Sequence, residues 1–277
     1  MPLQVAFTQP DGSVFEHLLY EGRPYHIGRS GDADIIIDHP QVSRLHARLN
    51  AENDASWALN DTSSSGCFVQ GAAVSNLTIK QSRTILLGPV ACRFTPLQNL
   101  DVVRLDSKKV WQDKQLFRHT IQFQQCADTQ ALLALAQQCL QQSLGCERAA
   151  VVLVNKDNSH HQPLGFLPWM QEEGFTGSRT FINQCLAQRE VLAIGSLAGD
   201  AQMASQHSVI RHQIKAALAV PLHVENSLIG VLYADSLEQR GYFSQTDVAF
   251  ARKLANLLSL RLIYHNIEHE ISQLANV

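Results

Sequence analysis

Short apolar runs alternate with turns rich in glycine, arginine and serine between Gly28 and Gly71, and this alternation constrains the first half of the chain. The flanking sequence repeats it, and Asp11-Gly12 between two runs is a hairpin signal because both residues tolerate a positive φ. The segments expected as strands are 3–8, 14–19, 24–28, 35–38, 47–49, 57–60, 67–69, 84–86 and 91–94. Many short strands with no convincing helix predict an N-terminal antiparallel β-sandwich over residues 1–96.

The polar residues of this stretch gather in three turns. These are Gly28-Arg29-Ser30, Ser43-Arg44-Leu45-His46, and the run from Asp61 to Gly66. Arginine presents a planar fork of N–H donors and serine presents a short hydroxyl, which are groups that hold an anion. A single Gly-Arg or Ser-rich turn is usually just a solvated loop. Together, at one end of a rigid scaffold, the three turns favour a phosphate-binding site.

In their order and approximate spacing these turns resemble the motifs of the forkhead-associated (FHA) domain, a reader of phosphothreonine peptides. The resemblance covers residues 3–96. It implies that Arg29 contacts the phosphate or the peptide backbone, that the Ser43 hydroxyl bonds the phosphate, and that Arg44 and Ser64 add contacts. It also implies that His46 braces the loops, a structural role shared by Gly28, Gly66 and Gly71.

Three positions depart from the family pattern. Ser65 stands where an asparagine usually holds the peptide main chain, and one hydroxyl cannot bridge a donor and an acceptor as an amide does. Cys67 replaces a common threonine, and Gln70 replaces the asparagine before Gly71. Since Asn accepts left-handed turns more readily than Gln, that turn is expected to differ. Ser65 is kept among the expected peptide-binding residues.

Bulk properties exclude several classes of protein. The chain has 277 residues, 45% of them hydrophobic, which suits two ordinary domains. A net charge of −3 argues against nonspecific nucleic-acid binding. The six cysteines form no Cys-x-x-Cys pair, and no apolar run approaches a membrane span, so we expect a cytoplasmic protein with no bound metal or cofactor.

Residues 97–126 are expected to be a linker, with charges alternating from 97 to 109, followed by a connecting helix from 110 to 125. Residues 127–277 then form the second domain, which begins with a helix capped by Asp128. The expected strands are 149–155, 191–194, 216–224 and 228–235, the last two joined as a hairpin, and a helix covers 175–188. This pattern predicts an α/β or α+β domain.

The second half resembles a GAF domain over residues 127–266. The resemblance rests on Ile214 to Leu222, on Ile229 to Ser236, and on Phe243 to Asp247 at the start of the last helix. It implies a small-molecule sensor or a dimerisation module. Asn155-Lys156 matches only the first part of the cyclic-nucleotide pattern, and no chromophore-binding cysteine motif is present. A structural GAF domain is favoured, and a cyclic-nucleotide or other small-molecule sensor is the alternative.

The last helix begins with Ser244 and Asp247, which resemble a capping box. Its apolar residues then recur three and four positions apart: Leu257, Leu260, Tyr264, Ile267, Ile271 and Leu274. Such spacing predicts a coiled-coil seam and a homodimer, and the alternative is a helix that packs only on its own sheet. The His265-Asn266-Ile267-Glu268-His269 pattern occurs in zinc peptidases, but we expect a solvated helix face there, because no third ligand is evident.

These patterns predict a non-enzymatic signalling protein. The first domain is expected to bind a phosphothreonine segment of a partner, such as a Ser/Thr kinase or its substrate. The second domain is expected to pair two copies of the chain. In the rival hypothesis, the protein responds mainly to a small molecule bound in the pocket of the second domain.

Overall fold

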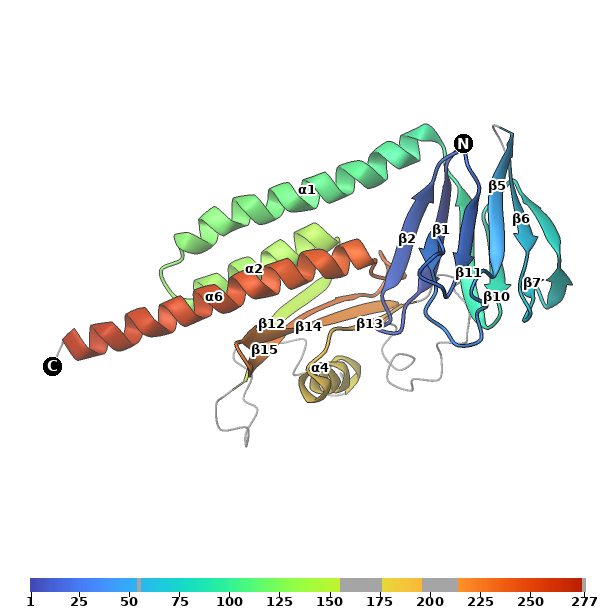
Figure 1. Cartoon of the computed structure of the whole chain (residues 1–277). Helices are drawn as coiled ribbons and strands as arrows, with labels where there is room; N and C mark the ends of the chain where they lie inside the picture. The colour runs from blue at the N-terminus through green and yellow to red at the C-terminus, as the bar shows by residue number, and fades with distance from the viewer. Residues whose placement is uncertain (54–55, 155–175, 196–213, 276–277) are drawn as a thin grey trace. The chain divides into compact units, whose positions relative to one another are not determined.

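The computed structural model describes residues 1–53, 56–154, 176–195 and 214–275. The chain divides into two compact units. The first comprises Met1–Pro10 with Val14–Lys108, and the second comprises Asp11–Ser13 with Lys109–Val277. The two predicted domains are present in this order, with a β-rich first unit and a second unit of helices around a sheet (Figure 1).

The first unit is a sandwich of two sheets. The six-stranded sheet has the order β2 (Val14–Leu19), β1 (Leu3–Thr8), β11 (Val90–Pro96), β10 (Arg83–Leu87), β7 (Cys67–Val69) and β8 (Ala72–Val74). The five-stranded sheet has the order β4 (Ile35–Ile36), β3 (Tyr25–Gly28), β5 (Ala47–Asn53), β6 (Ser56–Asp61) and β9 (Asn76–Ile79). Neighbouring strands are antiparallel except β3 and β4, which are parallel.

The sandwich core is made by alternate residues of the strands, as the predicted pattern requires. Leu3 and Val5 of β1, Trp57 and Leu59 of β6, and Phe94 of β11 are fully buried. The prediction of an antiparallel sandwich is confirmed. The strands β8 and β9 were not predicted, because most of their side chains are exposed and give no clear alternation of apolar and polar residues. No side chain of β8 is fully buried.

The second unit contains a four-stranded antiparallel sheet. Its order is β12 (Arg148–Leu153), β15 (Ser227–Ser236), β14 (Ala216–Val224) and β13 (Leu192–Ile194). The helices α2 (Thr129–Leu144) and α6 (Gln245–Ala275) cover one face, and α4 (Thr176–Gln188) covers the other (Figure 1). The predicted hairpin of the last two strands is confirmed by the pairing of β14 with β15.

Each face of this sheet has its own apolar core. On the face covered by α2 and α6, the core includes Leu140 of α2, Leu218 of β14 and Leu254 of α6. On the α4 face it includes Phe181 of α4 and Tyr233 of β15. A sheet covered on both faces explains why its strands have nearly continuous apolar sequences.

The helix ends follow the predicted chemistry. Asp128 caps α2, accepting a hydrogen bond of 2.7 Å at Oδ1 from the amide of Ala131, and Gly145 ends this helix in the left-handed conformation. At the start of α6 the Asp247 carboxylate accepts from the amide of Ser244 at 3.0 Å, and the Ser244 hydroxyl accepts from the amide of Asp247 at 3.3 Å. This reciprocal pair is a capping box.

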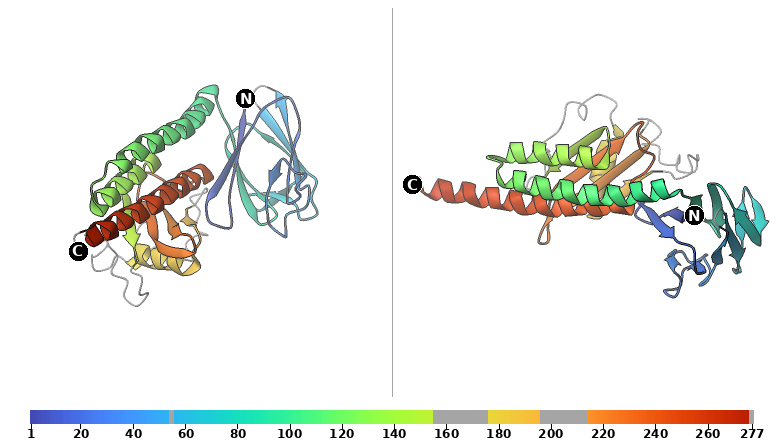
Figure 2. Two further views of the ribbon diagram at one scale, coloured as in Figure 1. Left: turned by 60° about the vertical axis from the view of Figure 1, so that its left-hand side comes forward. Right: turned by 90° about the horizontal axis from the view of Figure 1, so that it is seen from above.

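The connecting helix begins earlier than the predicted residue 110, because residues 99–109 already form the first turns of α1 (Asn99–Gln124). Their alternating charges are a solvated helix surface, as the pair of Asp101 with Arg104 at 3.6 Å illustrates. Further along, α1 runs beside α6 (Figure 2). Lys253 contacts Asp113 at 2.8 Å, and Arg261 donates to the carbonyl of Gln124 at 3.4 Å.

The apolar side chains of α6 are buried in its first half and exposed in its second half. Its first half buries Val248, Ala251, Leu254 and Leu258 against the sheet. Of the predicted seam, Leu260, Tyr264, Ile267 and Ile271 are between 47% and 65% exposed. No helix in the described part of the chain is both long and apolar enough to span a membrane.

Candidate functional site

The three predicted turns meet at one end of the sandwich, joined by backbone hydrogen bonds. The amide of Arg29 donates to the carbonyl of Ser43 at 3.0 Å, and the amide of Ser30 donates to the carbonyl of Arg44 at 3.1 Å. These bonds hold the β3–β4 connection against the β4–β5 connection. The side chains of Arg29 and Arg44 are exposed to solvent. Two guanidinium groups are therefore carried by adjacent segments of backbone.

The hydroxyls of Ser43 and Ser64 lie together across two of these turns. Their Oγ atoms are 3.2 Å apart, and the Ser64 amide donates to the Ser43 Oγ at 3.2 Å. Ser43 is half-buried and Ser64 is exposed. A pair of hydroxyls held this way can turn its protons toward an incoming phosphate oxygen without moving the backbone.

His46 links the same two turns from beneath. Its Nδ1 accepts from the amide of Ser43 at 3.1 Å, and its Nε2 lies 3.1 Å from the carbonyl of Gly66. Since Nδ1 accepts, the proton is on Nε2, which donates to Gly66. The side chain is fully buried, and this burial lowers the pKa of His46, so the ring is held neutral.

Asp61 organises the turn that carries Ser64. Its carboxylate accepts from the amides of Ser63 at 2.9 Å and Cys67 at 3.1 Å, while the Ser63 hydroxyl accepts from the amide of Gly66 at 2.7 Å. Burial by itself raises the pKa of Asp61, but the hydrogen bonds from Ser63 and Cys67 outweigh it and hold this pKa below its ordinary value. The sequence interpretation gave Asp61 no role.

One potential cation cluster lies within this scaffold, formed by ligand atoms of His46, Asp61 and Cys67 within 4.8 Å of one another. The His46 nitrogens and the Asp61 oxygens already bond the backbone amides and carbonyl described above. Burial raises the pKa of Cys67 to about 12, so its sulfur is a protonated thiol. In these hydrogen-bonded and protonated states the three side chains hold the loops together and are not suited to bind a metal ion.

At two positions of the predicted site the backbone geometry explains why the residue is glycine. A Cβ on Gly28 would lie 2.1 Å from the carbonyl oxygen of Arg44, so only glycine lets the two turns approach. Gly66 has a φ of 84°, in the left-handed region. Gly71 follows Gln70 in the two-residue turn between β7 and β8, and both have positive φ, 84° and 50°.

The turn between β7 and β8 tests what was expected of Gln70. The expected change of turn does not occur, because Gln70 itself adopts the left-handed conformation that a two-residue hairpin requires at both positions. The sandwich imposes this geometry at a cost of about 1–2 kcal/mol for a residue with a Cβ.

Ser65 is exposed beside Ser64, and its hydroxyl donates to the carbonyl of Gln41 at 2.9 Å. The proton of this hydroxyl is therefore used to tie the β6–β7 turn to the β4–β5 connection. Its oxygen can still accept a hydrogen bond from a ligand. The contact with Gln41 was not foreseen, because its carbonyl has no sequence signal.

The base of the Arg29 turn is held by a second carboxylate. Asp34 bonds Arg23 at 2.7 Å and accepts from the amide of His26 at 2.8 Å, and the Arg23 guanidinium also lies 4.0 Å from the centre of the Tyr25 ring. Asp34 thereby fixes both ends of the segment from 26 to 34. In the sequence, only the presence of Arg23 and Asp34 in neighbouring turns could have suggested this ion pair.

In the second unit, Asp235 is engaged in structural contacts. It accepts two bonds of 2.6 Å from Arg148 and one of 2.6 Å from the Tyr233 hydroxyl. Burial raises the pKa of Asp235 against the lowering effect of these partners. The Asn155-Lys156 pattern lies outside the described residues.

Among the side chains that the structure describes, the zinc-peptidase pattern forms no cluster of metal-ligating atoms. His265 was expected on a solvated helix face, but its side chain is only 10% exposed and lies 4.0 Å from Glu268. The solvated-face prediction is therefore wrong for His265, since this part of α6 packs beside the end of α1. The side chain of His269 lies outside the described residues.

Among solved structures, FHA domains and one further protein are similar to about a third of the chain. The FHA-1 domain of Mycobacterium tuberculosis Rv1747 is 24% identical, covers 34% of this chain and 94% of its own, and has a TM-score of 0.30. The Slr1951 protein of Synechocystis sp. is 30% identical, with 35% and 98% covered and a TM-score of 0.32. The yeast Dun1 FHA domain, solved with a doubly phosphorylated peptide, is 21% identical, with 34% and 73% covered and a TM-score of 0.30.

Family models agree with the division of the chain into two units. The FHA domain model matches residues 25–88, and the GAF domain model matches residues 128–262. A search of curated proteins found no match. On the two family matches, the chain contains an FHA domain followed by a GAF domain.

Proposed function

We propose that the FHA domain binds phosphothreonine-containing segments of partner proteins, and that the protein is a non-enzymatic cytoplasmic adaptor. The observation that carries this proposal is the paired hydroxyls of Ser43 and Ser64, 3.2 Å apart, between turns that expose Arg29 and Arg44. FHA domains are known for phosphothreonine-peptide binding, and the FHA domain model matches residues 25–88, which include Arg29, Ser43 and Ser64.

The ligand chemistry fits this arrangement. A phosphothreonine carries nearly two negative charges and three acceptor oxygens. Each charge-assisted hydrogen bond contributes about 1.5–3 kcal/mol. Two or three such bonds, reduced by the cost of ordering the peptide, are compatible with a roughly micromolar dissociation constant. Ser65 and Arg44 are proposed to add weaker contacts to the peptide.

The test is isothermal calorimetry with a degenerate phosphothreonine library and its unphosphorylated counterpart. Wild-type protein is expected to bind only the phosphorylated peptides, and Arg29→Ala to remove that binding. Arg48→Ala is the matched control, because Arg48 is an exposed arginine on β5 of the same domain. Equal affinity for both peptides, or undiminished binding by Arg29→Ala, would refute the proposal.

The GAF domain is proposed to pair two copies of the chain through α6. Leu260, Tyr264, Ile267 and Ile271 are exposed at helical spacing beyond the part of α6 that packs on its own sheet. The neighbouring helix α1 also exposes apolar side chains, with Val110 at 53%, Phe117 at 71% and Ile121 at 47%. Apolar stripes of this kind on adjacent helices are typical of helical interfaces.

Light scattering tests the pairing. We expect a dimeric mass for the full chain and a monomeric mass for Leu260→Glu combined with Ile267→Glu. Asn256→Glu with Gln245→Glu, at exposed polar positions of α6, is the matched control for added charge. A monomeric wild-type protein contradicts the dimer.

Ligand sensing by the GAF domain is the rival to a purely structural role. The GAF fold is a signalling and ligand-binding fold, and this supports the rival only at the level of the family. Native mass spectrometry of the purified protein separates the two: a retained small molecule favours sensing, and an unliganded mass favours dimerisation alone.

A further inference from the structure

A groove of the FHA domain lies at the edge of the sandwich, apart from the Ser43 and Ser64 hydroxyls. It is a groove of about 780 Å³ whose apolar lining includes Phe7, Phe15, Ile36, Ile37 and Val90. Phe7 and Phe15 contact each other with ring centres 4.9 Å apart and form its floor on one side. A groove of this volume can accept at least one large side chain.

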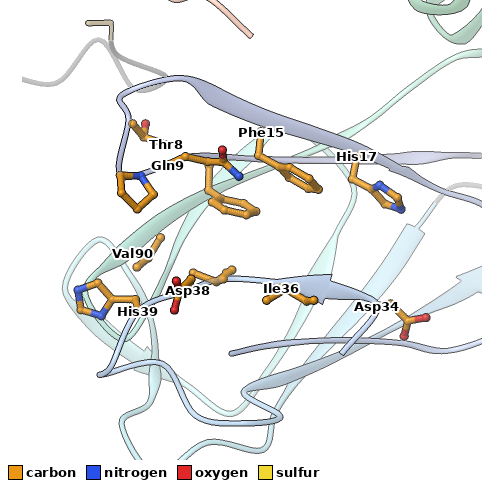
Figure 3. Close-up of a pocket in the computed structure, with 12 residues that line it drawn as sticks. Thr8, Gln9, Phe15, His17, Asp34, Ile36, Asp38, His39 and Val90 are labelled. Atoms are coloured by element: carbon orange, nitrogen blue, oxygen red, sulfur yellow. The ribbon is translucent and has the colours of Figure 1, made fainter. Parts of the chain in front are cut away.

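Its two banks are the edge strands of the two sheets. β2 is the last strand of the six-stranded sheet, and β4 is the last strand of the five-stranded sheet. Figure 3 shows Phe15 and His17 of β2 on one bank, with Ile36 and Asp34 on the other. Ile36 is 49% exposed, so a large aliphatic side chain borders the groove in contact with water.

The backbone of β4 is suited to pairing with a further strand. The amide of Ile37 donates to the carbonyl of Gly28 in β3 at 2.8 Å. Because successive residues of a strand point their backbone groups to opposite sides, the amide and carbonyl of Ile36 point away from β3, toward the edge of the sheet. An extended segment added at such an edge gains main-chain hydrogen bonds and places alternate side chains in the neighbouring groove.

The groove and the phosphate site share one segment of chain. Asp38 and His39 line the groove, and Ser43 follows in the same β4–β5 connection. This connection is ordered by hydrogen bonds from the amide of Val42 to the carbonyl of His39 and from the amide of Gln41 to His39 Nδ1. A segment paired with the edge of β4 therefore lies beside the connection that leads to Ser43.

Resting on the proposed function, we propose that this groove binds a bulky apolar side chain of the same phosphorylated partner segment, while the backbone of that segment pairs with the edge of β4. The groove is thus a specificity site that selects among phosphothreonine segments. Asp38 lies on its β4 bank, so an acidic side chain is disfavoured there by like-charge repulsion.

The experiment uses the full chain and a series of phosphothreonine peptides in which a single leucine moves along an alanine-rich sequence. One leucine position is expected to bind about 10-fold tighter than the all-alanine peptide, and aspartate at that position to bind weaker than alanine. Ten-fold corresponds to about 1.4 kcal/mol. Ile36→Glu is expected to remove the leucine advantage, so that the leucine and all-alanine phosphopeptides bind this variant with equal affinity.

Tyr20→Glu is the matched control, because Tyr20 is 49% exposed in the same domain and does not line the groove. Phosphate-dependent binding with no leucine preference, or a preference that survives Ile36→Glu, overturns the groove proposal and leaves the proposed function standing. Loss of all phosphate dependence, with Arg29→Ala also without effect, overturns both. A change of mass in light scattering for Ile36→Glu assigns the groove to contact between copies of this chain and likewise overturns the proposal.

Discussion

Replacement of His46 tests whether the phosphate site is preassembled by the fold. The His46 ring makes two hydrogen bonds, to the amide of Ser43 and to the carbonyl of Gly66, each 3.1 Å long. In His46→Ala both groups lose their partner in a buried site. Each lost bond costs about 1 kcal/mol and the remaining cavity costs more, so the free energy of unfolding is expected to fall by about 3 kcal/mol.

The same residue makes stability depend on pH. Burial holds the pKa of His46 below its ordinary value of 6.5, so the folded protein binds fewer protons than the unfolded chain. The contribution is therefore fully present above pH 6.5 and declines as the pH falls from 6.5 through the folded-state pKa. A proton on Nδ1 would face the Ser43 amide, donor against donor, which breaks the link between the turns.

The assay is urea unfolding followed by the fluorescence of Trp57, which is fully buried in the sandwich. Trp111 and Trp169 are replaced by phenylalanine so that only the FHA domain reports. His46→Gln is expected to flatten the pH dependence, whereas His223→Gln, at an exposed position in the GAF domain, leaves it unchanged. An unchanged midpoint for His46→Ala, or the same pH dependence in His46→Gln as in wild type, would refute the reasoning.

Three further changes follow from particular contacts. Gln70→Asn is expected to raise the free energy of unfolding by about 0.5–1 kcal/mol, because asparagine adopts the left-handed conformation at lower cost; an unchanged urea midpoint contradicts this. Ser65→Asn restores the amide that FHA domains use on peptide backbone and is expected to tighten phosphopeptide binding several-fold in calorimetry; weaker binding would show that the lost bond to Gln41 matters more. Gln112→Ala removes buried bonds of 3.1 Å to the Ser143 carbonyl and 3.0 Å to Asp247, and a loss of about 2–3 kcal/mol is expected in GAF-domain unfolding by circular dichroism; wild-type stability would show that these bonds do not anchor α1.

The sequence predicted the elements whose signals are local. Alternating apolar residues identified most strands of the sandwich, and Asp128, Ser244 and Asp247 marked helix starts because capping uses side chains within one turn. The glycine, arginine and serine turns also identified the candidate site, since an anion site needs those residue types in loops. Alternating charge misled the prediction at residues 99–109, where the same pattern suits a solvated helix.

Only the tertiary structure decided how distant residues meet. It brings Ser43 within hydrogen-bonding distance of Ser64, and it gives Asp61 and the carbonyl of Gln41 their roles in holding the turns. It also forces Gln70 into a left-handed turn that its own preference opposes, and opens a groove between edge strands of different sheets. Residue preferences act over a few positions, whereas these features depend on the packing of two sheets, which fixes loops from different strands against one another.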